Sequence, residues 1–218
     1  MKDLLNRVIE KNRYLNQYGK VADYIPALGS ANPKDFGICL MDVKGNIYTG
    51  GDYDKKFTIQ SISKVLSLIL AIMDNGESEV FKRVGMEPTS EAFNSLYRLD
   101  LFSQAKPLNP MINSGAIVTT SMIKGYGQEK FNRLLVFIRK ILDDNNIDYN
   151  KRTYLSERAT GDKNRAIAYL LKDKGLLEGS IDEILDNYFK QCSIELNSID
   201  LAKIGIFIAK GCRTLEAG

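Results

Sequence analysis

Two residues that could carry out nucleophilic chemistry, Ser61 and Lys64, stand three positions apart in the stretch Phe57-Thr-Ile-Gln-Ser-Ile-Ser-Lys64. A serine hydroxyl becomes a nucleophile when a neighbouring base takes its proton. A lysine can be that base if burial makes its ammonium easier to deprotonate. The pair is therefore a candidate for acyl transfer through a serine ester.

The same spacing occurs twice more, at Ser103 with Lys106 and at Ser121 with Lys124. The first of these pairs is followed directly by a proline, where helix is disfavoured. Ser121 lies near the end of its expected helix, far from the free N–H groups of a first turn. Ser61 alone opens a long apolar helix, whose first turn can stabilise an oxyanion. On spacing and position alone, a capping serine and a solvated lysine remain the simpler interpretation.

The chain contains no histidine among its 218 residues. This excludes hydrolases built on Ser-His-Asp or Cys-His, and it removes the usual zinc ligand. Any nucleophile here must find its base among lysine, tyrosine, aspartate or glutamate. We expect neither a metal nor a cofactor.

The composition is typical of a globular protein, with 44% hydrophobic and 26% charged residues. The net charge of +3 comes from 30 basic and 27 acidic residues that are interspersed, so we expect neither nucleic-acid nor membrane binding. The three scattered cysteines, Cys39, Cys192 and Cys212, favour a reduced, cytoplasmic setting over a disulfide framework. The N-terminus lacks the apolar core of a signal peptide.

The hydrophobic pattern predicts a β-hairpin attached to a largely helical body. Alternating residues indicate strands over 36–42 and 46–50, joined by a turn at 43–45. Helical spacing predicts helices over 3–18, 61–74, 90–99, 113–124, 128–144, 162–174, 181–192 and 198–210. One face of the helix over 128–144 should be buried, with Phe131, Leu134, Leu135, Ile138 and Leu142.

Five stretches, taken in order, resemble bacterial serine-dependent glutaminases of the β-lactamase and penicillin-binding-protein superfamily. They are Gly19-Lys-Val-Ala-Asp-Tyr-Ile-Pro26, Phe57-Thr-Ile-Gln-Ser-Ile-Ser-Lys64, Asn109-Pro-Met-Ile-Asn-Ser-Gly-Ala-Ile117, Ser156-Glu-Arg-Ala-Thr-Gly-Asp-Lys-Asn164 and Tyr188-Phe-Lys-Gln-Cys-Ser193. Five separated motifs in one order are far more specific than any one of them. The resemblance covers essentially the whole chain from about Gly19 onward.

The resemblance implies an α+β fold of the β-lactamase and transpeptidase type, with residues 1–218 in a single domain. It implies hydrolysis of L-glutamine to L-glutamate and ammonia through an acyl-enzyme at Ser61, with Lys64 as base. The substrate-binding positions that it implies are Tyr24, Ser61, Asn113, Glu157, Asn164 and Tyr188. It also implies a homo-oligomer, a tetramer by analogy.

This inventory fits the substrate, because glutamine brings an ammonium, a carboxylate and a side-chain amide. Glu157 can pair with the ammonium, asparagines can donate to carboxylate oxygens, and tyrosine hydroxyls can orient the amide. Each residue also has a plainer interpretation. Asn113 could cap a helix, Glu157 could be a solvated carboxylate in a turn, and Asn164 could be structural. Tyr24 and Tyr188 could be partly buried aromatics.

The resemblance breaks at the C-terminal end, because family members continue into further strands and a Lys-Ser-Gly motif that this chain lacks. We therefore expect a domain that is incomplete at its C-terminus, with its C-terminal sheet strands missing and weak or absent activity. Two alternatives stay open. One is a non-catalytic remnant that binds glutamine or glutamate, or serves as an assembly partner. The other is a serine hydrolase of the penicillin-binding or β-lactamase type.

Overall fold

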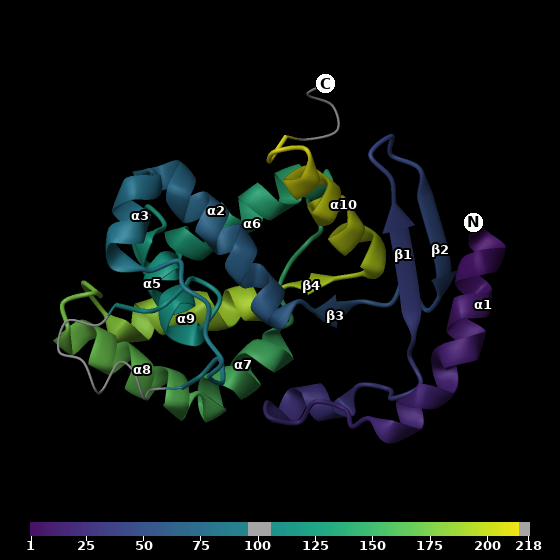
Figure 1. Ribbon diagram of the computed structural model, residues 1–218. Helices are drawn as coiled ribbons and strands as arrows, with labels where there is room; N and C mark the ends of the chain where they lie inside the picture. The colour runs from purple at the N-terminus through teal and green to yellow at the C-terminus, as the bar shows by residue number, and fades with distance from the viewer. Residues whose placement is uncertain (96–105, 214–218) are drawn as a thin grey trace.

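The two predicted strands form an antiparallel hairpin in the computed structural model, which describes residues 1–95 and 106–213 (Figure 1). Strand β1, Gly37–Met41, pairs with β2, Ile47–Gly51, in a register that sets Cys39 opposite Thr49. The Asp42 carboxylate closes the turn by accepting the backbone N–H groups of residues 44 and 46. The predicted hairpin is confirmed.

The N-terminal segment begins as helix α1, Lys2–Asn12, and packs along β2 with Leu5 and Ile9 buried. The helix predicted over 3–18 ends early, because the chain tightens after residue 12 into the 3₁₀ helix η1, Arg13–Tyr18. A second 3₁₀ turn, η2, Pro26–Ser30, follows. This segment runs from the hairpin to the helical body, where η2 meets α7 (Figure 1).

The helical body accounts for most of the chain (Figure 1). Its helices are α2 Ser63–Asn75, α3 Glu77–Arg83, α5 Asn113–Met122, α6 Glu129–Leu142, α7 Lys151–Thr160, α8 Asp162–Asp173, α9 Ile181–Cys192 and α10 Ser198–Ala209. The predicted helices from 113 onward are confirmed within a few residues. So is the buried face of α6. Of the helix predicted over 90–99, residues 96–99 lie outside the described residues, and residues 90–95 are not helical.

Helices α3 and α7 are not predicted by the hydrophobic pattern. Helix α7 buries only Thr153, Tyr154 and Glu157, so it lacks the apolar stripe that identifies a surface helix. Its start is fixed locally instead, since the Asn150 side chain accepts a hydrogen bond from the backbone N–H of Thr153.

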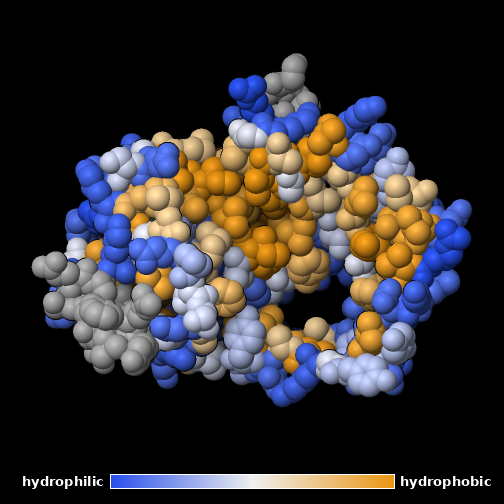
Figure 2. Space-filling view, in the orientation of Figure 1, coloured by the Kyte–Doolittle hydropathy of each residue, from blue (hydrophilic) through white to orange (hydrophobic). Residues whose placement is uncertain are grey.

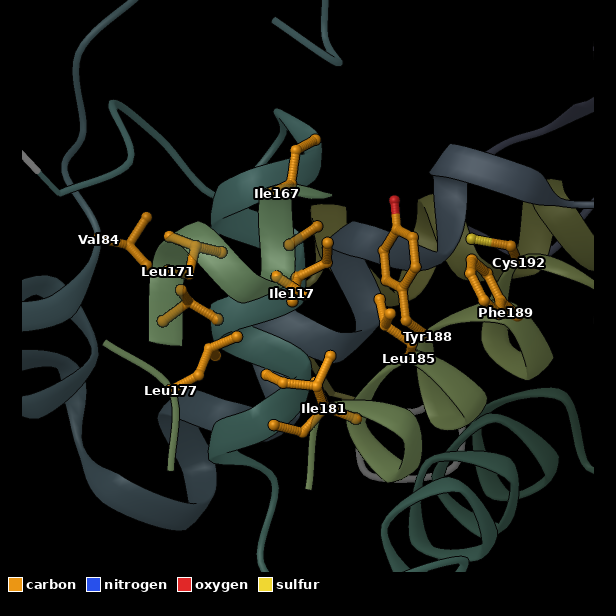
Figure 3. Packing of buried hydrophobic residues seen from close by; sticks show 14 of the residues in the cluster. Val84, Ile117, Ile167, Leu171, Leu177, Ile181, Leu185, Tyr188, Phe189 and Cys192 are labelled. Atoms are coloured by element: carbon orange, nitrogen blue, oxygen red, sulfur yellow. The ribbon is translucent and has the colours of Figure 1, made fainter. Parts of the chain in front are cut away.

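The described residues form two hydrophobic clusters in the core. One lies between α5, α8 and α9, and Figure 3 shows Tyr188 and Cys192 at its edge, with the Tyr188 hydroxyl pointing out of the cluster. The other joins α2 and α6 to Ile194, Leu196 and Ile204. The guanidinium group of Arg133 in α6 donates two hydrogen bonds, of 2.5 and 2.6 Å, to the carboxylate of Asp74 at the end of α2. Residues of α9 and of the segment after it therefore border both clusters.

A short ladder of strands, which the sequence reading missed, lies between the hairpin and the helices. Strand β3, Phe57–Thr58, pairs antiparallel with β4, Glu195–Leu196. The Ile59 N–H extends this pairing to the Ile194 carbonyl at 2.9 Å. Ile194 also bridges to Tyr149 on its other side. The hydrophobic pattern does not predict these strands, because two-residue strands are too short to show alternation.

Helix α10 follows β4 and lies beside β1 (Figure 1). An Asn197–Asp200 capping box fixes its start. Figure 2 shows apolar residues gathered over α2 and α10, and a hollow between the helical body and the hairpin. No helix in the described part of the chain combines the length and apolar character that crossing a membrane would require.

Gly115 of α5 offers a test of how tightly the helix packs. An added Cβ would stand 2.0 Å from the Asn109 carbonyl oxygen, so we expect Gly115→Ala to lower the free energy of unfolding by about 1–3 kcal/mol. Gly205→Ala is the matched control, because a Cβ at this exposed position in α10 would meet nothing within 4 Å. We expect that change to raise the free energy of unfolding by about 0.5–1 kcal/mol. Urea unfolding measures both, and equal effects would contradict the packing described.

Candidate active site

The six predicted substrate-binding residues come together around one cavity of about 230 Å³. This volume lies just below the roughly 300–1,000 Å³ of pockets for drug-sized ligands, so it suits a smaller molecule. The cavity is lined by Tyr24, Ile25, Gln60, Ser61, Asn94, Asn113, Glu157, Thr160, Gly161, Lys163, Asn164, Tyr188 and Cys192. These residues come from six separate stretches of the chain.

Ser61 lies in η3, Gln60–Ile62, a 3₁₀ turn between β3 and α2. Helix α2 begins at Ser63, two residues later than predicted, and its N-cap is Ile62. Ser61 is therefore not the cap of α2 and its side chain remains exposed at the cavity. The pairing of β3 with β4 fixes the chain immediately before it.

Lys64 is almost fully buried, with 1% of its surface exposed. Its ammonium donates to the Met111 carbonyl at 2.9 Å and to Asn113 Oδ1 at 2.8 Å, and it lies 5.5 Å from the centre of the Phe93 ring. The interpretation of Lys64 as a solvated residue is wrong. Burial lowers the pKa of this lysine, as a general base requires, while Cys192 and Glu157 oppose the shift.

Asn113 connects Lys64 to the far wall of the cavity. Its Oδ1 accepts from Lys64, and its Nδ2 donates to Asn164 Oδ1 at 3.0 Å. Asn113 is the first residue of α5, whose N-cap is Ile112, and its Oδ1 accepts from Lys64 and not from an N–H group of the helix. The capping interpretation of Asn113 is therefore wrong.

Glu157 lies within α7, and the turn predicted around it is wrong. Only 7% of the residue is exposed, and its Oε2 has no hydrogen-bond partner. Burial raises the pKa of this carboxyl from its ordinary 4.5 to about 8, with the Lys64 charge acting in the opposite direction. Burying a carboxyl without a hydrogen-bond partner costs folding free energy. A cation that enters the cavity could supply the missing partner of Glu157 Oε2.

The two tyrosines differ in their surroundings. Tyr188 is 2% exposed, and burial raises the pKa of its hydroxyl well above the ordinary value. Tyr24 is 67% exposed and its hydroxyl donates to Gln60 Oε1 at 3.3 Å. Partial burial, followed by the charge of Glu157, raises the pKa of Tyr24. Both hydroxyls are thus kept protonated, and the single O–H of Tyr24 is donated to Gln60.

The cavity also contains residues to which sequence reasoning assigned no role, among them Gln60, Gly161 and Cys192. Gly161 separates α7 from α8, and a Cβ there would stand 2.5 Å from the Phe189 ring. Cys192 is fully buried between Ser63 and Tyr188, and burial raises the pKa of its thiol. Only its place in the fifth motif could have drawn attention to it.

The Ser121 and Lys124 pair lies outside this cavity. Ser121 hydrogen-bonds the Val118 carbonyl in the last turn of α5 and does not line this cavity. Ser103 lies outside the described residues, and Lys106 donates to the Phe81 carbonyl. Among the residues that the structure describes, no three His, Cys, Asp or Glu side chains gather as a metal site would need.

An exposed serine, a buried lysine one turn later and a small polar cavity are typical of the class of serine hydrolases that use lysine as base. The family model described as Glutaminase matches residues 19–218. The chain is 53% identical over 210 residues to "Glutaminase 2" of Clostridium perfringens, covering 96% of this chain and 69% of that protein. It is 50% identical over 216 residues to a glutaminase of Clostridioides difficile, covering 99% and 70%. The chain belongs to the glutaminase family.

A solved structure of a glutaminase has the same fold as this chain. The probable glutaminase from Bacillus subtilis, complexed with 6-diazo-5-oxo-L-norleucine, has a TM-score of 0.85 and 35% identity to this chain. The alignment covers 96% of this chain and 64% of that one. The fold is therefore the mostly helical α+β fold of the β-lactamase-like glutaminases. The chain spans about two thirds of the length of the relatives it matches.

The buried Glu157 carboxyl should make stability depend on pH. Because its pKa is about 8 in the folded chain and near 4.5 when exposed, the folded state holds an extra proton between these values. Stability contributed by the neutral carboxyl is full below pH 4.5 and is lost as pH rises through about 8. We expect urea unfolding of Glu157→Gln to lack this decline. A Glu157→Gln variant with the same pH profile as the wild type would contradict the assignment.

Proposed function

We propose that the cavity binds L-glutamine and that Ser61 attacks its side-chain amide. The observation that carries the proposal is the buried, unpartnered Oε2 of Glu157 in the cavity that Ser61 opens onto. An α-ammonium group would complete this carboxylate as a charge-assisted hydrogen bond. The glutaminase relatives support the choice of glutamine among amino-acid amides.

The remaining groups suit the rest of the substrate. Asn164 accepts from Asn113 through its Oδ1 and keeps its amide N–H groups as donors for the α-carboxylate. Tyr24 and Tyr188 also line the cavity, where the Tyr24 oxygen can act as an acceptor because its proton is donated to Gln60. With the ammonium held at Glu157, the side-chain amide extends toward Ser61.

The chemistry uses Ser61 as nucleophile and Lys64 as base. The serine oxygen forms a bond to the side-chain carbonyl carbon while its proton passes to a neutral Lys64. The carbon–nitrogen bond then breaks, and the nitrogen leaves as ammonia with the proton from the lysine. Water next attacks the glutamyl ester, which releases glutamate and restores the serine. The backbone N–H of Ser61 supplies one donor to the oxyanion.

The burial and hydrogen bonds of Lys64 support its role as the base. Its ammonium is bonded to Met111 and Asn113, so the amine is fixed in place while burial favours its neutral form. Loss of the proton costs less here than it would in water. The cytoplasmic location and the homo-oligomer that the family resemblance implies stay predictions.

A diazoketone probe tests the nucleophile without requiring turnover. With 6-diazo-5-oxo-L-norleucine, the diazo carbon gains a proton, the serine oxygen bonds to that carbon, and dinitrogen leaves. We expect peptide mass spectrometry to place one adduct, the inhibitor less dinitrogen, on Ser61. Ser61→Ala should abolish labelling and Ser121→Ala should leave it intact, because Ser121 lies outside the cavity. An adduct on another residue would contradict the proposal.

Binding of L-glutamate should release a proton from Glu157. Because the carboxyl is mostly neutral at pH 7 and the ligand ammonium requires its anion, affinity should rise about tenfold per pH unit up to pH 8 and then level off. Calorimetry in two buffers of different ionisation enthalpy measures the released proton. Glu157→Gln should bind weakly without this pH dependence. Proton-neutral binding by the wild type at pH 7 would refute the ammonium site.

A further inference from the structure

The residue immediately before Ser61 has an unusual backbone conformation. Gln60 has φ of +46°, in the left-handed region, which glycine, asparagine and aspartate adopt far more readily than glutamine. The other non-glycine residues with positive φ in the described chain, Asp143 and Cys212, lie just after α6 and α10. Such a conformation persists only where the surroundings hold it, and it is often found at functional sites.

The Gln60 side chain and backbone connect the segments that meet at the cavity. Its Nε2 donates to Thr58 Oγ1 at 3.0 Å in β3, and its Oε1 accepts from the Tyr24 hydroxyl at 3.3 Å. Its carbonyl oxygen accepts from Ser63 Oγ at 2.7 Å, in the first turn of α2. One residue therefore joins β3, the N-terminal segment and α2 around the turn that carries Ser61.

We propose that Gln60 is a positioning residue, which holds the Ser61 turn and the Tyr24 hydroxyl in register for attack on the substrate. The inference rests on the proposed function, since it deepens the role of the same site. The left-handed backbone turns the chain from β3 into η3, so that Ser61 is presented at the cavity. The side-chain amide then fixes this turn from both sides.

The chemistry of the residue supports a bridge rather than a packing role. An amide is one group with a donor and an acceptor, and Gln60 uses both, on partners from different segments. Asparagine would tolerate the backbone better, but its side chain is one methylene shorter. Glycine would remove the backbone strain and the bridge together. The presence of glutamine here is explained if the reach of its side chain matters.

The test compares labelling by 6-diazo-5-oxo-L-norleucine in the wild type, Gln60→Asn and Gln60→Gly. We expect both variants to fold, to bind glutamate within about threefold of the wild type, and to show a maximal labelling rate about ten- to a hundredfold lower. A merely structural role would instead lower thermal stability and affinity together. Asp143→Gly, at a left-handed position outside this cavity, is the control and should label at the wild-type rate.

A double-mutant cycle with Thr58 isolates the bridge. Thr58 does not line the cavity, so Thr58→Val should slow labelling only through Gln60, and the double variant should be no slower than Gln60→Asn alone. Additive losses, or a Gln60→Asn variant that labels as fast as the wild type, would overturn the inference. Failure of the wild type itself to label Ser61 would instead overturn the proposed function, so the two failures are distinguishable.

Discussion

The segment from Ser193 to Leu196 is the constraint on which the site depends. On one side it pairs with β3, two residues before Gln60, and on the other it meets residues 148–150, which immediately precede α7. Asn150 caps α7 and also donates to Glu195. Ser61 and Glu157 are therefore positioned from opposite edges of one short strand. The same segment continues from α9, which supplies Tyr188.

This arrangement buries two ionisable groups at one site, Glu157 in the lining of the cavity and Lys64 hydrogen-bonded to the lining residue Asn113. Lys64 is satisfied by a carbonyl and an amide oxygen, whereas Glu157 keeps an unpartnered oxygen. The asymmetry gives each group a separate task. Burial makes the neutral form of the lysine easier to reach, and it leaves a carboxyl oxygen without a partner, which the ammonium of the substrate can supply. The unpartnered carboxyl of Glu157 lowers the free energy of unfolding, and a bound ammonium would remove that cost. Such local destabilisation is a common feature of functional sites.

Much of the fold follows from the sequence, because the hairpin turn and the apolar faces of α6, α8 and α9 are local patterns. The rest depends on long-range contacts. Helix α7 has almost no apolar stripe, and β3 and β4 are two residues each, so neither could be seen before its partner was in place. The six site residues were predicted through ordered motifs and they do converge. Chain patterns could not show that Lys64 and Glu157 are buried, or that Gln60 bridges two segments.

The most direct measurement is a crystal structure of this chain with L-glutamate. We expect the ligand to occupy the cavity, with its ammonium within hydrogen-bonding distance of the Glu157 carboxylate and its side-chain carboxyl beside the Ser61 hydroxyl. A ligand bound elsewhere, or one seated in the cavity with its ammonium directed away from Glu157, would contradict this expectation.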